Sequence, residues 1–383
     1  MYKPKKFSFN NGMQISFFTV IFTLIILSLQ AKPPLLTDKE LASSPPRTIR
    51  TCCAFGADLS YGGLPFIKRT DIVSVNEIGN HHYLGGRSES NGIVYTRRGG
   101  FIDIGHLRDC ADWTAYIYSV IVFSQKNNNK TVIHLGAEGG TKALTFTIPV
   151  GTDSLTEYQL ARKIAYDISL WHEIATWFGA STVPLVPERF SSFSPEDVFS
   201  NLLGATLGVM AIKSELPYDE AMTQILARTL DSLESLKTAA ETYAAMEKVE
   251  NIWWTNKKNL PNKNITLKRY FPSDAYLIPW LVPGFESKIP PYTLARPDVG
   301  LSDYYQLKIK LNYKFPSKIV SSFPKNRIIT QKDFDFLISY IVKDINRLDE
   351  RTAYHLQKTK KRVERKQQRT HFSKGKITNQ SIN

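Results

Sequence analysis

The sequence predicts an α+β fold, in which short strands and helices occupy separate stretches of the chain. Three observations predict it. Short apolar runs fill residues 52–104, patterns with helical spacing dominate residues 154–248, and one alternating strand pattern follows residue 300. Because the strands cluster early and the helices cluster in the middle, a parallel sheet with alternating helices is disfavoured.

The N-terminal half supplies most of the predicted strands. A helix is expected from Arg108 to Phe123, after these strands, and a hairpin is expected over residues 131–148 around a glycine-rich turn. The early strands are separated by glycine pairs at 62–63, 85–86 and 99–100. This half is therefore expected to pack short strands and a hairpin with helices.

Capping residues indicate where the middle helices begin and end. Ser154 and Glu157 form a capping-box pattern, and the helix that they open is expected to end at Gly179. Ser194, followed by a proline, marks the start of a second helix. One long central helix is then expected over residues 217–248.

The C-terminal third begins with an irregular, proline-rich stretch over residues 255–300. Apolar residues then alternate with lysines over residues 307–315, which is typical of a half-buried strand. A last helix is expected over residues 331–357. The predicted fold thus ends on a strand and a helix.

The chain is long enough to bury a sizeable core, with 383 residues of which 42% are hydrophobic and 12% aromatic. We expect a single α+β domain over residues 51–350. Residues 1–31 would be a signal peptide or N-terminal anchor, residues 32–50 a proline-rich linker, and residues 351–383 a basic tail.

The first 31 residues have the order of a secretory signal. Lysines at positions 3, 5 and 6 precede the uncharged apolar run Ile15–Leu29, and Ala31 offers a cleavage point. The run is shorter than the roughly 20 residues of a membrane-spanning helix. An uncleaved anchor is the alternative, since Leu29 suits the −3 position poorly, and a buried core helix is less favoured. The sequence predicts an exported protein of the periplasm or cell envelope.

Three cysteines are present, Cys52, Cys53 and Cys110, so at most one internal disulfide can form. A bridge from Cys110 to either of the others would suit an oxidising compartment. The alternative is that all three are small buried residues. No lipobox precedes Cys52, so no lipid anchor is expected there.

The formal net charge of +14 is concentrated near the C-terminus, where residues 358–376 hold nine Lys or Arg and one acid, Glu364. The folded body is therefore only mildly basic. The tail is either a solvated helix end or a segment attracted to anionic lipid headgroups or envelope polymers. Nucleic acid is not expected as a partner, because the tail lacks interleaved aromatic residues.

Two clusters of polar residues carry the candidate chemistry. In the first, a strand ends near Asp103 and a helix begins, so that His106 and Asp109 follow with the spacing of one helical turn. Side chains and backbone donors converge at such junctions. In the second, His172 and Glu173 are neighbours on a helix, although the second histidine of a zinc-protease helix is absent.

Together the clusters predict a metal site. His106 and His172, with Asp103 or Asp109, would bind a divalent metal such as zinc through three protein ligands and one open position. Glu173, covered near the end of its helix, would be the general base that activates a bound water.

The alternative interpretation of both clusters is structural. His172 and Glu173 would then be polar helix residues whose hydrogen bonds are satisfied. A structural ion-pair network would consist of Asp103, Arg108 and Asp112. Two weaker candidates are the turn at His81-His82, as possible ligands, and the pair Glu188-Arg189, as possible cleft residues. No nucleophile elbow, phosphate loop or dinucleotide fingerprint is present in the sequence.

Several distinctive short motifs follow one another along the chain: Cys52–Gly56, Gly99–Trp113, Trp171–Gly179, Glu188–Asn201 and Trp253-Trp254. In these motifs and their order, over roughly residues 50–320, the chain resembles an uncharacterised bacterial exported family that is classed only as a domain of unknown function. The resemblance implies an envelope location and one family domain, and it supplies no activity. Family members often look like lipoproteins, whereas this chain lacks the lipobox.

Two function hypotheses follow. The first is a metal-assisted or carboxylate-based hydrolase that acts on an envelope substrate. The second is a non-catalytic envelope protein that binds a partner or an anionic surface polymer. Convergence of the histidines with a carboxylate would favour the first, and separate, individually satisfied side chains would favour the second.

Overall fold

The chain divides into two compact units, each of which is assembled from separate stretches of sequence. The first unit comprises Met1–Thr131, Phe146–Ser169 and Phe193–Tyr304, and the second comprises Val132–Thr145, Leu170–Ser192 and Tyr305–Asn383. Within them, this computed structural model describes residues 45, 50, 55–57, 59–61, 64–127, 132–149, 151–181, 188–256, 265–272, 274–323 and 327–348. The predicted domain boundaries at residues 51 and 350 stay a prediction.

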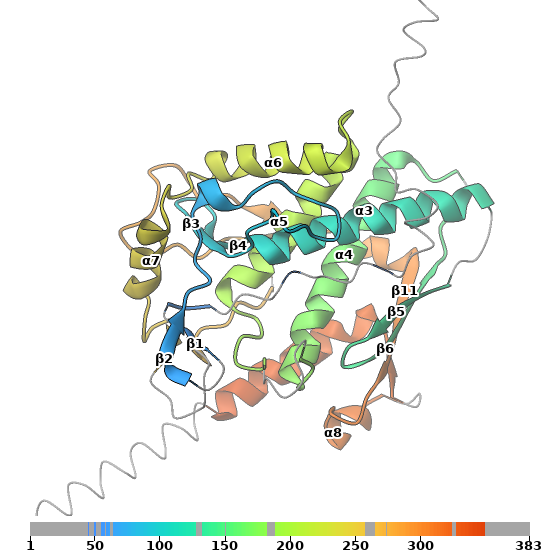
Figure 1. The fold of residues 1–383 in the computed structure, drawn as a ribbon. Helices are drawn as coiled ribbons and strands as arrows, with labels where there is room; N and C mark the ends of the chain where they lie inside the picture. The colour runs from blue at the N-terminus through green and yellow to red at the C-terminus, as the bar shows by residue number, and fades with distance from the viewer. Residues whose placement is uncertain are drawn as a thin grey trace, which may run out of the picture. The chain divides into compact units, whose positions relative to one another are not determined.

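The α+β class is confirmed, because helices occur together with small antiparallel sheets (Figure 1). The early strands of the first unit are two antiparallel hairpins, as expected. Their members are β1 Leu59–Tyr61 with β2 Leu64–Arg69, and β3 Ile93–Thr96 with β4 Gly100–Asp103. β4 leads directly into a helix, α3 Ile104–Asn127, which begins four residues before the predicted start at Arg108.

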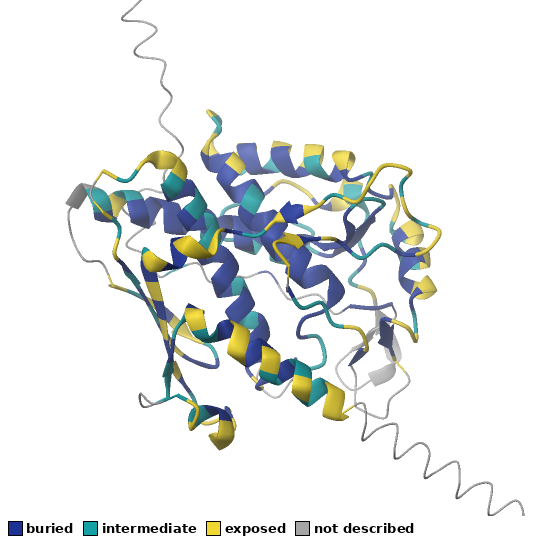
Figure 2. Ribbon diagram, turned by 180° about the vertical axis from the view of Figure 1, so that it is seen from behind, coloured by how far each residue is buried: buried dark blue, intermediate teal, exposed yellow. Residues whose placement is uncertain are grey.

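Two long helices, α3 and α5 Pro195–Ile212, pack side by side in the same direction and bury most of their length (Figure 2). Glycines allow the close approach. A Cβ on Gly204 would lie 2.0 Å from the carbonyl oxygen of Leu107, and a Cβ on Gly208 would lie 2.8 Å from that of Ala111. The backbones therefore touch, and both helices begin at the same end of the pair.

The long helix predicted over residues 217–248 is wrong, since two helices occupy this stretch. They are α6 Tyr218–Ser232 and α7 Ala239–Lys248. Glu234 has a positive φ of 55°, and Ser235 forms an isolated bridge with Thr96 of β3. Thr238 then opens α7 with a capping box to Glu241.

In its described residues, the irregular stretch that follows α7 contains two-residue strands and a short 3₁₀ helix. These elements are β7 Trp254–Thr255, β8 Ile265–Thr266, β9 Tyr276–Leu277, β10 Leu294–Ala295 and a 3₁₀ helix at Val299–Asp303. The stretch packs on the β3–β4 hairpin, where the hydroxyl of Tyr95 accepts a hydrogen bond from the backbone N–H of Val282 at 2.8 Å. An aromatic core, in which Trp254 is buried, lies here.

α4 Ser154–Trp177 begins in the first unit and continues into the second. The predicted capping box at Ser154 is wrong by one residue, because the cap is Asp153. Its carboxylate accepts hydrogen bonds from the N–H of Thr156 at 2.9 Å and from its hydroxyl at 2.7 Å. The predicted stop is confirmed, since Gly179 takes a φ of 89° just beyond the helix.

The second unit contains a four-stranded sheet in the order β12-β11-β6-β5. The predicted hairpin is confirmed, and the lysine-rich strand alternates buried and exposed residues as expected. The strands are β5 Val132–Ala137, β6 Gly140–Phe146, β11 Tyr305–Leu311 and β12 Ile328–Ile329, and a one-turn helix α8 Ser317–Val320 joins the last two. The predicted last helix is present over residues 334–348. Trp171 of α4 stacks on Phe315 and Phe334, with ring centroids 5.8 Å apart in both pairs.

The expected signal segment, the linker apart from residues 45 and 50, and the basic tail beyond residue 350 lie outside the described residues. Among the helices that the structure does describe, none has the length and apolar character needed to cross a membrane. Cys52 and Cys53 also lie outside, so the disulfide stays a prediction. The Cys110 thiol is buried and donates to the side-chain oxygen of Asn201 at 3.4 Å.

Candidate functional site

Asp103 and His106 lie together at the junction between β4 and α3, as the sequence predicts. The Asp103 carboxylate accepts a hydrogen bond from the backbone N–H of His106 at 3.0 Å, which caps the start of α3. The Nδ1 atom of His106 lies 3.4 Å from the other oxygen of Asp103. Asp103 is fully buried, whereas the His106 side chain keeps 12% of its surface exposed, so the pair can be reached from solvent.

Asp197, in the first turn of α5, completes the cluster. Its Oδ1 lies 2.7 Å from His106 Nδ1. One donor atom from each of Asp103, His106 and Asp197 lies within 4.8 Å of the others, and these three form the group of potential metal ligands found among the described residues. The parallel packing of α3 and α5 explains the convergence, because it brings the two helix starts to the same place.

A third acidic side chain, Glu196, is buried beside this cluster. The Ser194 hydroxyl lies 2.8 Å from a carboxyl oxygen of Glu196 and 2.7 Å from one of Asp197. The second oxygen of Glu196 is buried and has no hydrogen-bond partner in the described part of the chain. Burial, and then the neighbouring charge of Asp197, raise the pKa of Glu196 well above its usual value.

Ser194 does not act as the side-chain cap that the sequence predicts for α5. It holds the N-cap position, as expected, but its side chain makes no capping bond to the helix backbone. It bridges two carboxyl groups instead. A single hydroxyl can donate only one hydrogen bond, so one of the two carboxyl groups must donate to Ser194 in return.

The donor set suits a divalent cation. Two carboxylates and one imidazole form a mixed oxygen and nitrogen set that zinc, manganese or iron accepts, and metal–ligand distances of about 2.0–2.2 Å require donors this close. The structural alternative is that His106 simply bridges two acids. That alternative does not account for the third acid, Glu196, one of whose carboxyl oxygens is buried without a hydrogen bond to any described residue.

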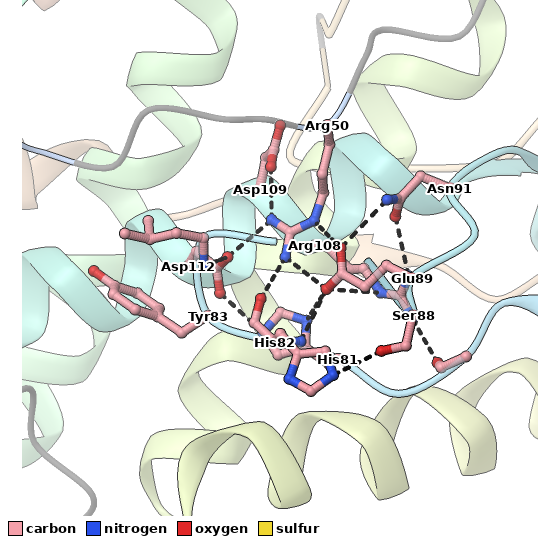
Figure 3. Close-up of polar contacts among 12 residues, drawn as sticks. Arg50, His81, His82, Tyr83, Ser88, Glu89, Asn91, Arg108, Asp109 and Asp112 are labelled. Carbon is pink, nitrogen blue, oxygen red and sulfur yellow. Dashed lines mark hydrogen bonds and ion pairs between the residues drawn. The ribbon is translucent and has the colours of Figure 1, made fainter. Parts of the chain in front are cut away.

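Asp109, the other predicted ligand on α3, belongs to a different cluster, which we call the Arg50 network (Figure 3). The Arg50 guanidinium donates to Glu89 at 2.7 and 2.9 Å, to Asp109 at 2.7 Å, to Asp112 at 2.8 Å and to the carbonyl oxygen of His82 at 2.9 Å. The Arg50 side chain is only 2% exposed. Asp109 therefore has a strong cationic partner of its own.

Further groups surround the acids of the Arg50 network. Asp112 also lies 2.9 Å from His81 Nε2 and accepts from the Tyr218 hydroxyl at 3.1 Å. The hydrogen bonds and positive charge of Arg50 lower the pKa of Glu89 to about 2, against an opposing effect of burial. Arg108 donates to the carbonyl oxygens of Ile78 and Gly79 and to Asn91, and burial lowers its pKa to about 10.

The structural alternative from the sequence thus holds for Arg108 and Asp112, which do belong to an ion-pair network. Its third expected member, Asp103, lies instead with His106 and Asp197. His81 is a network residue with an acidic partner, and His82 lies at the exposed edge of the same loop, with 45% of its side chain exposed.

His172 and Glu173 lie in the second unit. His172 Nδ1 lies 2.5 Å from Glu138 Oε1, and the other oxygen of Glu138 accepts from Lys142 at 2.6 Å. Burial opposes ionisation of Glu138, but the charges of Lys142 and His172 prevail and lower its pKa far below the usual value. Glu173 is buried, as expected, and its backbone oxygen accepts from the Ser192 hydroxyl at 2.8 Å. Their roles as ligand and general base stay predictions.

Asp197 is the candidate ligand that sequence reasoning missed. Glu196 and Asp197 follow a serine and a proline at a helix start. Acidic residues are common there because their negative charge interacts favourably with the positive end of the helix dipole. Their burial was the informative signal, and it cannot be read from the residue types alone.

Comparison with known protein families identifies the family to which the chain belongs. Residues 40–283 match the family described as a protein of unknown function (DUF4056), and the chain belongs to that family. The expected membership in an uncharacterised family is therefore confirmed, and the matched segment contains Asp103, His106 and Asp197. Neither a curated protein nor a solved structure matches the chain.

Proposed function

We propose that this protein is a metal-dependent hydrolase whose divalent cation is held by Asp103, His106 and Asp197. The observation that carries the proposal is the convergence of these three donors within 4.8 Å of one another at the starts of two helices. A cation in this site would polarise a substrate carbonyl or phosphoryl oxygen and supply a nucleophilic water at neutral pH.

The chain's own residues give the site an open side and a polar wall. Asp103 and Asp197 are buried, which fixes their carboxylates, and the partly exposed His106 borders solvent. Glu196 offers a carboxyl oxygen that makes no hydrogen bond to the described residues, so it can orient a water or a substrate hydroxyl. Ser194 holds Glu196 and Asp197 in a fixed relation to each other.

We further propose that the enzyme works outside the cytosol on an envelope substrate. The charged start, the apolar run and the small residue at Ala31 support this proposal. The basic residues of the tail support attachment to an anionic surface. Zinc is the first cation to test, since one imidazole and two carboxylates match its usual ligands.

The test is metal analysis of the purified full chain after incubation with zinc or manganese and dialysis. We expect about one ion per chain in the wild type, as for a single site with three protein ligands. Asp197→Asn and His106→Ala should lose most of it. Asp109→Asn is the matched control, because it changes the same residue type on the same helix as His106 and should keep the ion.

His172→Ala separates this ligand set from the one that the sequence predicts. Retained metal in His172→Ala supports Asp103, His106 and Asp197 as the complete protein ligand set. Loss of metal would make His172 a ligand. A wild type that binds neither zinc nor manganese, although it is folded by its melting transition, would refute the metal site and leave the non-catalytic envelope protein as the better hypothesis.

A further inference from the structure

A second group of side chains, separate from the metal cluster, has the connectivity of an acyl-transfer site. Ser88 Oγ lies 2.8 Å from His82 Nε2 (Figure 3). On the other side of the ring, His82 Nδ1 lies 3.7 Å from Asp219 Oδ2. Serine, histidine and aspartate thus face one another through the same atoms as in a serine hydrolase, with a hydrogen bond between serine and histidine and a longer contact between histidine and aspartate.

The carboxylate of this group is held in place. Asp219 lies in the first turn of α6, and its second oxygen accepts a hydrogen bond from the backbone N–H of Tyr83 at 2.8 Å. The neighbouring N–H of His81 donates to the hydroxyl of Thr223, also on α6, at 2.9 Å. Two backbone donors therefore fasten the loop to α6 and fix the distance between His82 and Asp219.

The imidazole is held by the Arg50 network. The N–H of His82 donates to Glu89 at 2.9 Å, and its carbonyl oxygen accepts from Arg50 at 2.9 Å and from Gly85 at 2.8 Å. The ring packs directly on Gly86, where a Cβ would lie 2.6 Å from the imidazole Cδ2. An exposed histidine is normally mobile, whereas this one is restrained by buried charges at its backbone and by glycine beneath its ring.

We propose that Ser88, His82 and Asp219 form a serine acyl-transfer site, with Ser88 as nucleophile, His82 as general base and Asp219 as the positioning residue. The Nδ1–Oδ2 distance is longer than a hydrogen bond, and such contacts commonly tighten when a substrate binds. Acyl transfer to a serine hydroxyl takes an ester as its substrate class. The ester would approach from solvent, because the side chains of His82 and Asp219 are each 45% exposed.

The reaction balances with these three side chains, the ester and one water molecule. Ser88 Oγ attacks the ester carbonyl carbon while His82 Nε2 takes the hydroxyl proton. The bond to the alcohol oxygen then breaks, and His82 returns the proton to the departing alcohol. His82 then takes a proton from water, which attacks the acyl-serine. The bond to Ser88 Oγ breaks, the carboxylic acid is released, and His82 returns the proton to Ser88 Oγ.

The test is covalent labelling of the full chain with a fluorophosphonate, followed by mass spectrometry of the modified peptide. A phosphorus–oxygen bond to Ser88 should form with release of fluoride. Labelling should disappear in Ser88→Ala and slow by about 100-fold or more in His82→Gln. Ser90→Ala, two residues away, is the matched control and should label at the wild-type rate.

Two further labelling experiments distinguish an acyl-transfer site from a structural cluster and from the metal site. Asp219→Asn should slow labelling, and Asp219→Glu should restore part of the rate, since a carboxylate that only stabilised α6 would not affect a serine reagent. Labelling should persist after chelation of divalent metal, so this proposal can fail or hold independently of the metal site. In folded protein, the absence of an adduct at Ser88, or equal labelling of His82→Gln, would overturn it.

Discussion

The Arg50 network allows a quantitative test of what holds the first unit together. Arg50→Leu removes the five hydrogen bonds that the guanidinium donates and keeps much of the apolar stem. The carboxylates of Glu89 and Asp112 remain behind with side chains 0% and 2% exposed. The variant therefore leaves buried negative charge without its main partner.

Two separate arguments give the expected loss of unfolding free energy in Arg50→Leu. Removing one partner of a buried ion pair costs about 3–5 kcal/mol. Independently, the drop in the pKa of Glu89 from 4.5 to about 2 corresponds to about 3 kcal/mol of favourable interaction with the ionised carboxylate. Arg50 is the largest favourable contributor, and the N–H of His82 and the charge of Arg108 contribute less. The two values agree, so we expect Arg50→Leu to lose about 3 kcal/mol or more.

The pH dependence gives the sign of the effect. The folded-state pKa of Glu89 is lowered, so its contribution is complete above about pH 4.5 and is lost as the pH falls towards 2. In the variant, nothing depresses this pKa to the same extent. The difference between wild type and Arg50→Leu should therefore be largest near neutral pH and should narrow below pH 4.5.

The assay is urea unfolding at several pH values, with Arg228→Leu as the control. Arg228 lies on the exposed side of α6, and among the described residues its guanidinium donates to the carbonyl oxygen of Gln224 at 3.3 Å. Its loss should therefore change stability by less than about 0.5 kcal/mol. If Arg50→Leu loses less than about 1 kcal/mol, or if the difference does not depend on pH, the network does not stabilise the fold in this way.

Two other predictions concern the helix pair and the location. Gly204→Ala should push α5 away from α3, because its Cβ would meet backbone atoms of Leu107 at 2.0–2.8 Å. By urea unfolding it should lower the free energy of unfolding by about 1–3 kcal/mol, and it should weaken metal binding. Gly300→Ala, whose added Cβ would have its nearest neighbour 3.5 Å away, is the control and should leave the stability unchanged. A reporter fused after residue 50 should be active only outside the cytosol; reporter activity retained in the cytosol would contradict export.

Local patterns predicted much of the fold correctly. The β5–β6 hairpin, the stop of α4 at Gly179 and the strand β11 each depend on residues close in sequence, so their patterns were sufficient. The break between α6 and α7 was missed because apolar residues continue at helical spacing through Leu230, Leu233 and Leu236. The capping box from Thr238 to Glu241 was the available signal for the break.

The sites depend on contacts between distant parts of the chain, which patterns cannot supply. Asp103 and His106 could be paired from their spacing alone, since both lie at one helix start. Asp197 joins them only because two glycines let α5 lie against α3. In the same way, His82 and Asp219 are separated by more than one hundred residues and meet only because the loop is fastened to α6.

The shared direction of α3 and α5 has an electrostatic consequence for the protein without metal. Each helix carries about half a positive charge at its start, and both starts face the cluster of Asp103 and Asp197. These partial charges offset some of the repulsion between the two acids before any cation arrives. The helix pair would then be folded before the ion binds. Release of the ion should leave α3 and α5 packed together.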